Sequence, residues 1–278
     1  MKAIRVERTG GPEVLELIDA EPAAPRAGQL AVRVAVAGVN YIDTYHRSGS
    51  YPQTPPFGLG QEGAGVITAI GSDITGADVT GFAVGDRVAW WHTPLAGDNG
   101  SYAEHVVVNA ASTVHVPDAV SDEIAAAVLL QGLTAHYLIA SSYPVAAGDT
   151  VLVHAAAGGV GLLLTQLAKA RGARVIATAS TAEKRLLAKD NGADEVLGYD
   201  DFAAEVRRLT DGVGVSVVYD GVGKDTFDDS LASLRPRGLL ALYGASSGQV
   251  PPFDLQRLNP AGSLFVTRPT LAHHVATR

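Results

Sequence analysis

Apolar and polar residues alternate along the first part of the chain, with the period of two that is typical of β-strands. The opening residues, Met1 to Glu7, follow this pattern. Four further strand candidates are separated by Gly, Pro and Asp residues: 30–40, 64–71, 84–92 and 102–108. Because no helical pattern lies between them, we expect roughly the first 120 residues to form an antiparallel or barrel-like unit.

The pattern then changes to a period of about 3.6. Ser121 is placed to cap an Ala/Leu-rich helix whose first turn carries Asp122 and Glu123. From Thr150 onward, strand candidates alternate with helical patterns, one of which starts at a capping box, Ser180 to Glu183, and ends near Gly192. The strand candidates are 150–154, 174–178, 195–198, 215–219, 239–243 and 263–267. Six strands joined by crossovers predict a doubly wound parallel sheet.

The stretch from Thr150 to Gly161 reads T-V-L-V-H-A-A-A-G-G-V-G and leads into a helical pattern. Strand, glycine turn and helix are the context in which such a motif binds a dinucleotide, because the helix start presents free N–H groups to a pyrophosphate. The match to G-x-G-x-x-G is imperfect: Ala156 occupies the first glycine position, and Gly158 and Gly161 the other two. A merely tight strand–helix turn is the alternative.

The residues that follow the second predicted parallel strand, 174–178, favour NADPH over NAD as the cofactor. An enzyme that prefers NAD usually has Asp or Glu there to bind the ribose hydroxyls. This strand instead ends in Ala179 and Ser180, and Lys184 and Arg185 follow. A lysine in the first turn of a helix is unfavourable for the helix dipole, so an anionic ligand such as the phosphate of NADPH would explain Lys184. The alternative is a solvated surface lysine.

Composition excludes several classes of function. The chain of 278 residues is 47% hydrophobic and 18% charged, as in globular enzymes. Its net charge of −8 and its lack of a Lys/Arg cluster argue against nucleic-acid binding. No apolar run is expected to reach the length of a membrane span, and the N-terminus does not resemble a signal peptide, so we expect a cytoplasmic protein. The absence of cysteine excludes disulfides and Cys-ligated zinc.

Several segments together resemble the zinc-independent quinone oxidoreductases of the medium-chain dehydrogenase/reductase superfamily. They are G-V-N-Y-I-D-T-Y-H-R-S-G-S-Y-P (38–52), G-Q-E-G-A-G-V (60–66), L-Q-G-L-T-A-H-Y-L (130–138), H-A-A-A-G-G-V-G (154–161), V-V-Y-D-G-V-G (217–223) and S-L-F-V-T-R-P (263–269). The resemblance implies an α/β protein with a GroES-like β-rich catalytic domain at 1–122 and a Rossmann NADPH-binding domain at 123–262. Residues 263–278 would add the last Rossmann strand and begin a return to the catalytic domain.

The resemblance also implies which residues bind NADPH. Ser180, Lys184 and Tyr199 would hold the 2′-phosphate. The pyrophosphate and nicotinamide contacts would come from Asn40, Tyr45, Thr134, Gly158, Gly159, Val160, Gly161, Val222, Gly244, Ala245, Ser246, Ser247 and Arg268. Relatives often carry an amide where this chain has Ala245, so that contact departs from the family pattern.

Asn40, Tyr45, Tyr51 and Arg268 are the candidates for holding the acceptor over the nicotinamide. Tyr41 could join an aromatic face, although a half-buried strand or loop tyrosine is at least as good an interpretation. Three carboxylates, those of Asp43, Glu62 and Glu104, are candidate acids, and we favour packing or helix-end roles for them because hydride transfer to a quinone needs no dedicated base.

Zinc-bearing relatives place Cys, His and Cys where this chain has Asn40, Gln61 and Gln131. An amide oxygen is a poor zinc ligand beside thiolate or imidazole, so we expect no metal site.

The expected activity is hydride transfer from NADPH to a quinone by a homodimer. The alternatives are reduction of α,β-unsaturated carbonyls and a non-catalytic, crystallin-like or RNA-associated NADPH-binding protein. The resemblance further implies a chain that continues past Arg278, so that the sequence is either a fragment or a trimmed protein.

Overall fold

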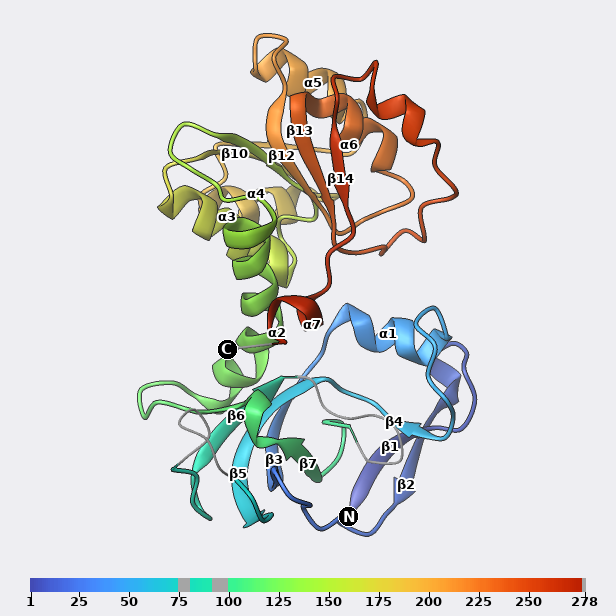
Figure 1. Cartoon of the computed structure of the whole chain (residues 1–278), viewed down its shortest axis with the longest axis vertical. Coiled ribbons are helices and arrows are strands. Elements are labelled where there is room, and N and C mark those ends of the chain that lie inside the picture. Colours follow the sequence, from blue (N-terminus) through green and yellow to red (C-terminus); the bar gives the residue numbers. More distant parts are fainter. Residues whose placement is uncertain (75–80, 92–99, 277–278) are drawn as a thin grey trace. The chain divides into compact units, whose positions relative to one another are not determined.

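The computed structural model describes residues 1–74, 81–91 and 100–276 (Figure 1). The chain divides into two compact units, Met1–Leu130 and Gln131–Arg278. Each unit has its own sheets and its own hydrophobic cores. The division falls inside a helix, α2 (Asp122–Tyr137), and not in a loop.

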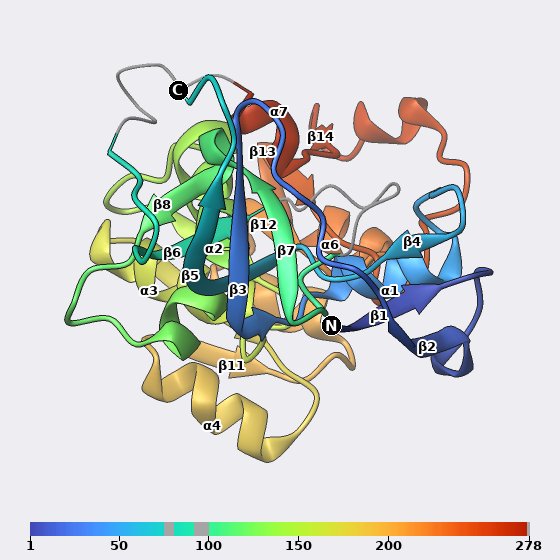
Figure 2. The ribbon, with the colours of Figure 1, turned by 90° about the horizontal axis from the view of Figure 1, so that it is seen from below.

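The first unit is built from antiparallel strands, as the lack of helical patterns between the strand candidates predicts. A five-stranded sheet has the order β7-β3-β5-β6-β8, and β3 and β7 lie side by side in Figure 2. Its strands are β3 (Gln29–Gly38), β5 (Glu62–Ile70), β6 (Arg87–Trp91), β7 (His105–Asn109) and β8 (Thr113–His115). A three-stranded sheet, β2-β1-β4, is made by β1 (Lys2–Val6), β2 (Leu15–Asp19) and β4 (Phe57–Gly58). Single-turn helices η1 (Pro12–Val14) and η2 (Ala110–Ser112) connect strands.

The core of the five-stranded sheet explains why these segments are strands. Leu30 and Val32 of β3 are fully buried in one core with Ile67 of β5 and with Val88 and Trp90 of β6. Buried residues two apart lie on the same face of a strand. All five predicted strands of this unit, Met1 to Glu7 included, are therefore confirmed, with boundaries shifted by a few residues; His92, at the end of one of them, lies outside the described residues.

Helix α1 (Tyr41–Ser48) corrects the sequence interpretation. The strand candidate 30–40 ends where this helix begins, and Tyr41 and Tyr45 are helical, not strand or loop, residues. Asn40 ends the extended segment and is the N-cap: its backbone N–H donates to a carboxylate oxygen of Asp43 at 2.9 Å. Gly49 ends the helix in the left-handed region (φ 82°), a conformation that favours glycine.

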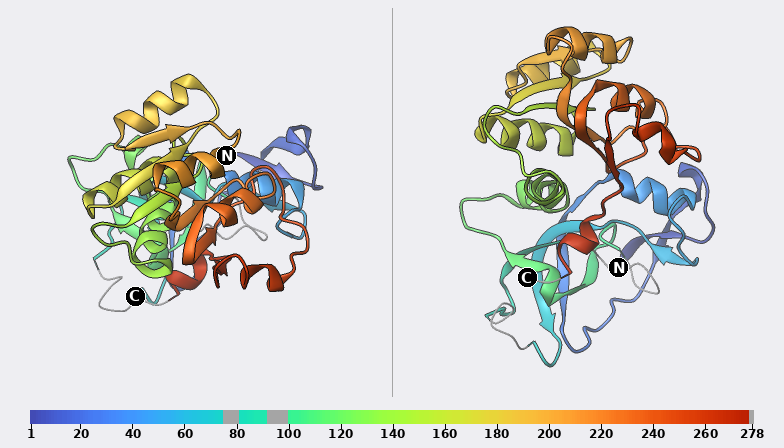
Figure 3. Two further views of the ribbon diagram at one scale, coloured as in Figure 1. Left: turned by 90° about the horizontal axis from the view of Figure 1, so that it is seen from above. Right: turned by 45° about the horizontal axis from the view of Figure 1, so that its top comes forward.

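The second unit contains a six-stranded parallel sheet of order β11-β10-β9-β12-β13-β14, which confirms the doubly wound prediction. Helices flank these strands in the views of Figure 3. The strands are β9 (Thr150–Val153), β10 (Arg174–Thr178), β11 (Glu195–Leu197), β12 (Val215–Asp220), β13 (Leu234–Leu242) and β14 (Phe265–Thr267). The helices are α3 (Gly159–Ala170), α4 (Ala182–Asp190), α5 (Phe202–Leu209) and α6 (Phe227–Ser233), with η4 (Leu255–Leu258) and α7 (Leu271–His274) near the C-terminal end.

Two cores cover the two faces of this sheet. On one face, Val151 and Val153 of β9 pack with Leu164 and Ala168 of α3. On the other, Leu152 packs with residues of α5 and α6. The apolar positions 160, 163, 164, 167 and 168 of α3 are all buried or half-buried in the first core, as their spacing predicts.

The start of α4 lies one residue later than the capping box predicted. Thr181, and not Ser180, is the N-cap, and its hydroxyl accepts the N–H of Lys184 at 3.2 Å. Glu183 is then too early in the helix to complete a capping box. Ser180 remains exposed between β10 and the helix.

One helical stretch among the described residues, Asp122–Ser142, is long and apolar enough to cross a membrane by length and composition. The expectation that no apolar run reaches that length was therefore wrong. The stretch consists of α2 and the π-helical turn η3 (Leu138–Ser142). Ala125 and Ala126 are buried in a core of the first unit, and Leu138 and Ile139 in a core of the second. Core helices pass the same test of length and composition, so this stretch is weak evidence for a membrane span.

Candidate active site

The candidate cofactor residues of the second unit follow the carboxyl ends of successive strands. Gly158–Gly161 follow β9, Ser180 follows β10, Tyr199 follows β11, Val222 follows β12, Gly244–Ser247 follow β13 and Arg268 follows β14. Since all six strands are parallel, these segments lie at one edge of the sheet. Strands β10 and β11 lie on one side of β9, and strands β12, β13 and β14 lie on the other. The strand order therefore reverses between β9 and β12, and in such sheets ligands bind at this point.

The glycine turn after β9 has no room for a side chain at position 161. A Cβ on Gly161 would overlap the carbonyl oxygen of Ala155 and lie 2.7 Å from the Cα of Ala156. Gly158 is exposed and extended (φ −82°, ψ 167°) as the N-cap of α3, so the first N–H groups of that helix begin at an open turn. Ala156, at the first glycine position of the motif, is fully buried. The turn therefore has the close backbone packing and the accessible helix start that a pyrophosphate needs.

Gln131 packs against the same turn. A Cβ on Gly159 would overlap the side-chain amide of Gln131, which belongs to α2 within the second unit. Thr134, one helical turn later on α2, is buried. The glycine at 159 thus makes space for an amide.

The residues assigned to the 2′-phosphate differ in their surroundings. Lys184 is exposed, and none of the ion pairs among the residues that the structure describes involves its ammonium. Tyr199 is half-buried, and its hydroxyl accepts the N–H of Ala155 at 3.1 Å. Arg185 donates to the carbonyl oxygens of Ala179 and Ser180, both at 3.4 Å. Of the two cations, Lys184 is the more exposed, whereas Arg185 directs its guanidinium at neighbouring backbone carbonyls.

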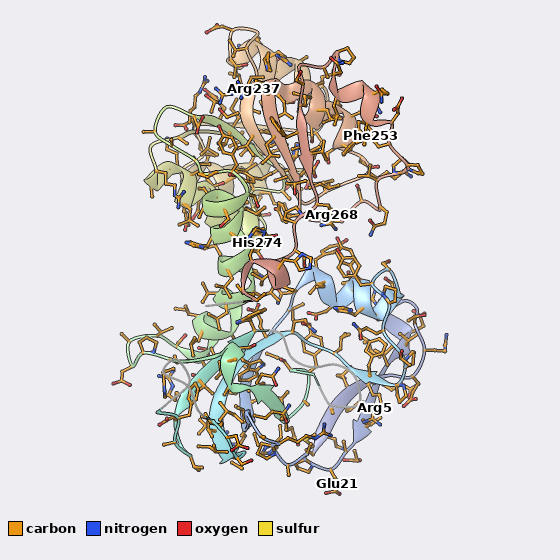
Figure 4. The ribbon with its side chains drawn as sticks, in the orientation of Figure 1. Arg5, Glu21, Arg237, Phe253, Arg268 and His274 are labelled. Atoms are coloured by element: carbon orange, nitrogen blue, oxygen red, sulfur yellow. The ribbon has the colours of Figure 1, made fainter. Side chains whose placement is uncertain are left out.

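The turns after β12 and β13 pack on each other. The N–H of Ser247 donates to the carbonyl of Val222 at 2.9 Å, and the N–H of Ser246 donates to the carbonyl of Gly221 at 3.2 Å. Ala245 is buried. The structure thus brings Val222 and Gly244–Ser247 together, whereas Arg268, labelled in Figure 4, is exposed and donates to the carbonyl of Leu242 at 3.1 Å.

In the first unit, Asn40 lies between two buried carboxyl groups. Its side-chain amide donates to Glu62 at 2.7 Å, and the second oxygen of Glu62 accepts the N–H of Leu130 at 2.8 Å. Asp43, besides accepting from the Asn40 backbone, accepts the hydroxyl of Tyr102 at 2.8 Å. Burial raises the pKa of both carboxyl groups, and these hydrogen bonds oppose the rise. Burial and the nearby Asp43 also raise the pKa of Tyr102.

Three of the tyrosines of the first unit, Tyr41, Tyr45 and Tyr51, form one aromatic cluster. The ring centroids of Tyr41 and Tyr45 are 5.3 Å apart, and those of Tyr45 and Tyr51 are 5.0 Å apart. Tyr41 is 56% exposed, whereas Tyr45 and Tyr51 are half-buried. A planar ligand could stack on such a cluster.

One group of buried polar residues at the sheet edge was absent from the sequence interpretation. His154, directly before the glycine turn, is hydrogen-bonded to Thr178 and Ser230, and Ser230 is bonded to Asp220. A histidine at the end of an otherwise apolar strand was the only sign of it in the sequence.

The chain matches two protein families. Residues 26–118 match the alcohol dehydrogenase GroES-like domain, and residues 159–273 match the zinc-binding dehydrogenase family. It is 48% identical to a quinone oxidoreductase of Pseudomonas aeruginosa, covering 99% of this chain and 83% of that protein. It is 40% identical to a 2-haloacrylate reductase of a Burkholderia species, covering 98% and 82%.

Solved structures agree with these matches. A mycobacterial protein in complex with NADPH is 55% identical, with a TM-score of 0.95 over 100% of this chain and 84% of that one. The Escherichia coli quinone oxidoreductase in complex with NADPH is 41% identical, with a TM-score of 0.94 over 100% and 83%. This chain belongs to the quinone oxidoreductase family of the medium-chain dehydrogenase/reductase superfamily.

Proposed function

We propose that this chain is an NADPH-dependent oxidoreductase that reduces quinones without a metal. The observation that carries the proposal is the edge of the parallel sheet, where the tightly packed Gly158–Gly161 turn opens helix α3 and the exposed Lys184 lies in the first turn of helix α4. Relatives with the same fold bind NADPH, which supports the same cofactor here. NADPH supplies the hydride, and the protein binds and orients the reactants.

The proposed cofactor contacts follow the edge of the sheet. The glycine turn would hold the pyrophosphate on backbone N–H groups. Ser180, Lys184 and Tyr199 would hold the 2′-phosphate. The nicotinamide end would meet the packed turns that contain Val222 and Gly244–Ser247, together with Thr134 and Arg268. Asn40, Tyr45 and Tyr51 are proposed to hold the acceptor by hydrogen bonding and stacking.

Zinc, which the family description implies, does not fit these residues. The three positions that hold zinc in zinc-bearing relatives carry the amides of Asn40, Gln61 and Gln131, and Asn40 already donates to Glu62. No group of three His, Cys, Asp or Glu side chains that could hold a metal ion occurs among the described residues. In zinc-bearing relatives the metal acts as a Lewis acid that stabilises the alkoxide during alcohol oxidation, whereas a quinone is electrophilic enough to accept hydride unaided.

Reduction of α,β-unsaturated carbonyls is the second candidate, and the 2-haloacrylate reductase relative favours it. These substrates also accept hydride at an electrophilic carbon. We further propose a cytoplasmic location and a homodimer, following the family resemblance.

The test is NADPH oxidation measured with quinones, unsaturated carbonyls and simple alcohols at one cofactor concentration. We expect turnover with quinones, weaker or comparable turnover with unsaturated carbonyls, and none with alcohols. Alcohol turnover without quinone turnover would overturn the reaction class. NADPH binding without any turnover would favour the non-catalytic alternative.

A further inference from the structure

A row of polar side chains crosses three neighbouring strands at the edge of the sheet. Val153 pairs with Ala177 on one side and with Tyr219 on the other, so the next residues, His154, Thr178 and Asp220, are aligned. All three are completely buried. They lie on the face covered by α5 and α6, because residues two positions earlier in each strand, such as Leu152, pack against those helices.

The row is joined to α6 by hydrogen bonds. One ring nitrogen of His154, Nδ1, lies 2.8 Å from the Thr178 hydroxyl, and Nε2 lies 3.0 Å from the Ser230 hydroxyl. Ser230 donates to Asp220 at 2.9 Å, and Thr226 donates to the same oxygen at 2.8 Å.

The directions of these bonds follow from the number of protons. A carboxylate only accepts, so the single hydroxyl proton of Ser230 goes to Asp220. Ser230 must then accept from His154, which places a proton on Nε2. In a neutral imidazole Nδ1 is bare and accepts from the hydroxyl of Thr178. Each group thus donates to the next: Thr178 to His154, His154 to Ser230, and Ser230 to Asp220.

Two members of the row, Asp220 and His154, contact residues of the proposed NADPH site. The second oxygen of Asp220 accepts the N–H groups of Val222 and Gly223 at 2.8 and 3.0 Å. The His154 ring is nearly parallel to that of Tyr199, with an interplanar angle of 26° and centroids 6.1 Å apart. Tyr199 in turn accepts from Ala155, the residue after His154.

We propose that His154 is a positioning residue, held neutral with its proton on Nε2, that fixes the glycine turn and Tyr199 relative to the Val222 turn. It touches no reactant and acts through the residues that do. The consequence for NADPH rests on the proposed function, but the proton arrangement and the coupling of the two turns do not.

The first test uses nuclear magnetic resonance of the ligand-free, full-length protein with 15N-labelled histidine at pH 7. We expect a one-bond proton coupling at Nε2 of His154 and none at Nδ1. A proton on Nδ1, or on both nitrogens, would overturn the proposal whether or not NADPH binds.

The second test compares two buried serines of α6. Ser230→Ala removes the hydroxyl that links His154 to Asp220, whereas Ser233→Ala removes an equally buried hydroxyl, which donates to the carbonyl of Asp229. We expect Ser230→Ala to shift the backbone amide signals of both Gly158–Gly161 and Val222–Gly223, and Ser233→Ala to leave them unchanged. Equal shifts in the two variants, or none in either, would overturn the coupling.

The third test measures affinity for NADPH. Ser230→Ala and Thr178→Val should weaken binding about tenfold, as expected for one lost buried hydrogen bond. Thr178→Ser, which keeps the hydroxyl, should restore the parent value. Unchanged affinity in both disruptive variants would overturn the positioning role, and a parent protein that binds no NADPH would instead refute the proposed function.

Discussion

The side-chain amide of Asn40 donates a 2.7 Å hydrogen bond to Glu62, a carboxyl group with no exposed surface. The other oxygen of Glu62 accepts a backbone N–H of α2, which cannot rotate away. The carboxyl group therefore fixes which end of the Asn40 amide is turned toward it. The orientation of a proposed acceptor-binding residue is set by a buried acid that contacts no substrate.

Glu62→Gln should reverse the Asn40 amide. The glutamine oxygen would stay on the N–H of Leu130, so its NH₂ would face Asn40, whose oxygen must then turn toward it. We expect a loss of about 1–2 kcal/mol in unfolding free energy and roughly a tenfold fall in kcat/KM with quinone. Glu104→Gln, at an exposed carboxylate that accepts the N–H of Lys2, is the control and should change neither. A Glu62→Gln protein with the parent kcat/KM would contradict this orienting role.

Lys184→Ala should remove most of the preference for NADPH over NADH. A charge-assisted hydrogen bond to phosphate contributes about 1.5–3 kcal/mol, which corresponds to roughly ten- to a hundredfold in affinity. Lys189→Ala removes the same charge from the other end of α4, where the ammonium donates to the carbonyl of Asp194, and should keep the preference. Equal affinities for the two cofactors in the parent, or an unchanged ratio in Lys184→Ala, would rule out the assignment.

The purified protein should contain no stoichiometric zinc. The reason is the amide chemistry of positions 40, 61 and 131 in a chain without cysteine. Elemental analysis checks this directly, and chelator treatment should leave quinone reduction intact. About one zinc per chain, with activity lost on chelation, would be the opposite result.

His154 should make the fold sensitive to acid. Burial lowers its pKa to about 4, and the negative charge of Asp220 opposes part of that shift. Between pH 6.5 and 4 the unfolded chain therefore binds a proton that the folded chain does not, and stability falls as the pH falls. The shift corresponds to about 3 kcal/mol.

Denaturant unfolding at several pH values should measure this loss. His154→Gln should flatten that part of the pH dependence, while His273→Gln, at an exposed histidine, should not. The raised pKa values of Asp43 and Glu62 act in the opposite direction, because these carboxyl groups hold protons more tightly when folded. Asp43 and Glu62 contribute equally to the pH dependence of the parent and of His154→Gln. If the unfolding free energies of the two proteins changed in parallel with pH, the prediction would be contradicted.

Gly161→Ala should destabilise the second unit. Its Cβ would overlap backbone atoms of Ala155, which cannot move aside as a flexible side chain can, and such overpacking costs about 1–3 kcal/mol. Gly158→Ala is the comparison, since the nearest atom to its Cβ is 3.2 Å away. Denaturant midpoints should fall clearly for Gly161→Ala and only slightly for Gly158→Ala; similar midpoints would show that the turn can relax.

Much of the fold could be predicted from local patterns. The strands of the parallel sheet appear as short apolar runs because both of their faces are buried, and α3 appears through its helical spacing. Helix α1 was missed because Tyr41–Ser48 has few apolar residues at helical spacing, although Asn40, Asp43 and Gly49 are ordinary start and stop signals.

Only those parts of the candidate site that belong to a local sequence motif could be predicted. The glycine turn and the missing acid after β10 are visible in the sequence. The contacts of Asn40 with Glu62, and of His154 with Ser230, join residues 22 and 76 positions apart. No local pattern specifies such pairs, because strand order and register bring them together.

The buried row beside the glycine turn also implies an order of assembly. Before α6 docks, Asp220 and His154 lack the hydroxyls of Thr226 and Ser230 and must remain hydrated, since an unpaired polar group in a dry interior is costly. The three strands can pair earlier, but this end of the sheet can lose its water only when that helix arrives. We therefore expect docking of α6 to be a late folding step, and the turns proposed to hold the cofactor to become ordered with it.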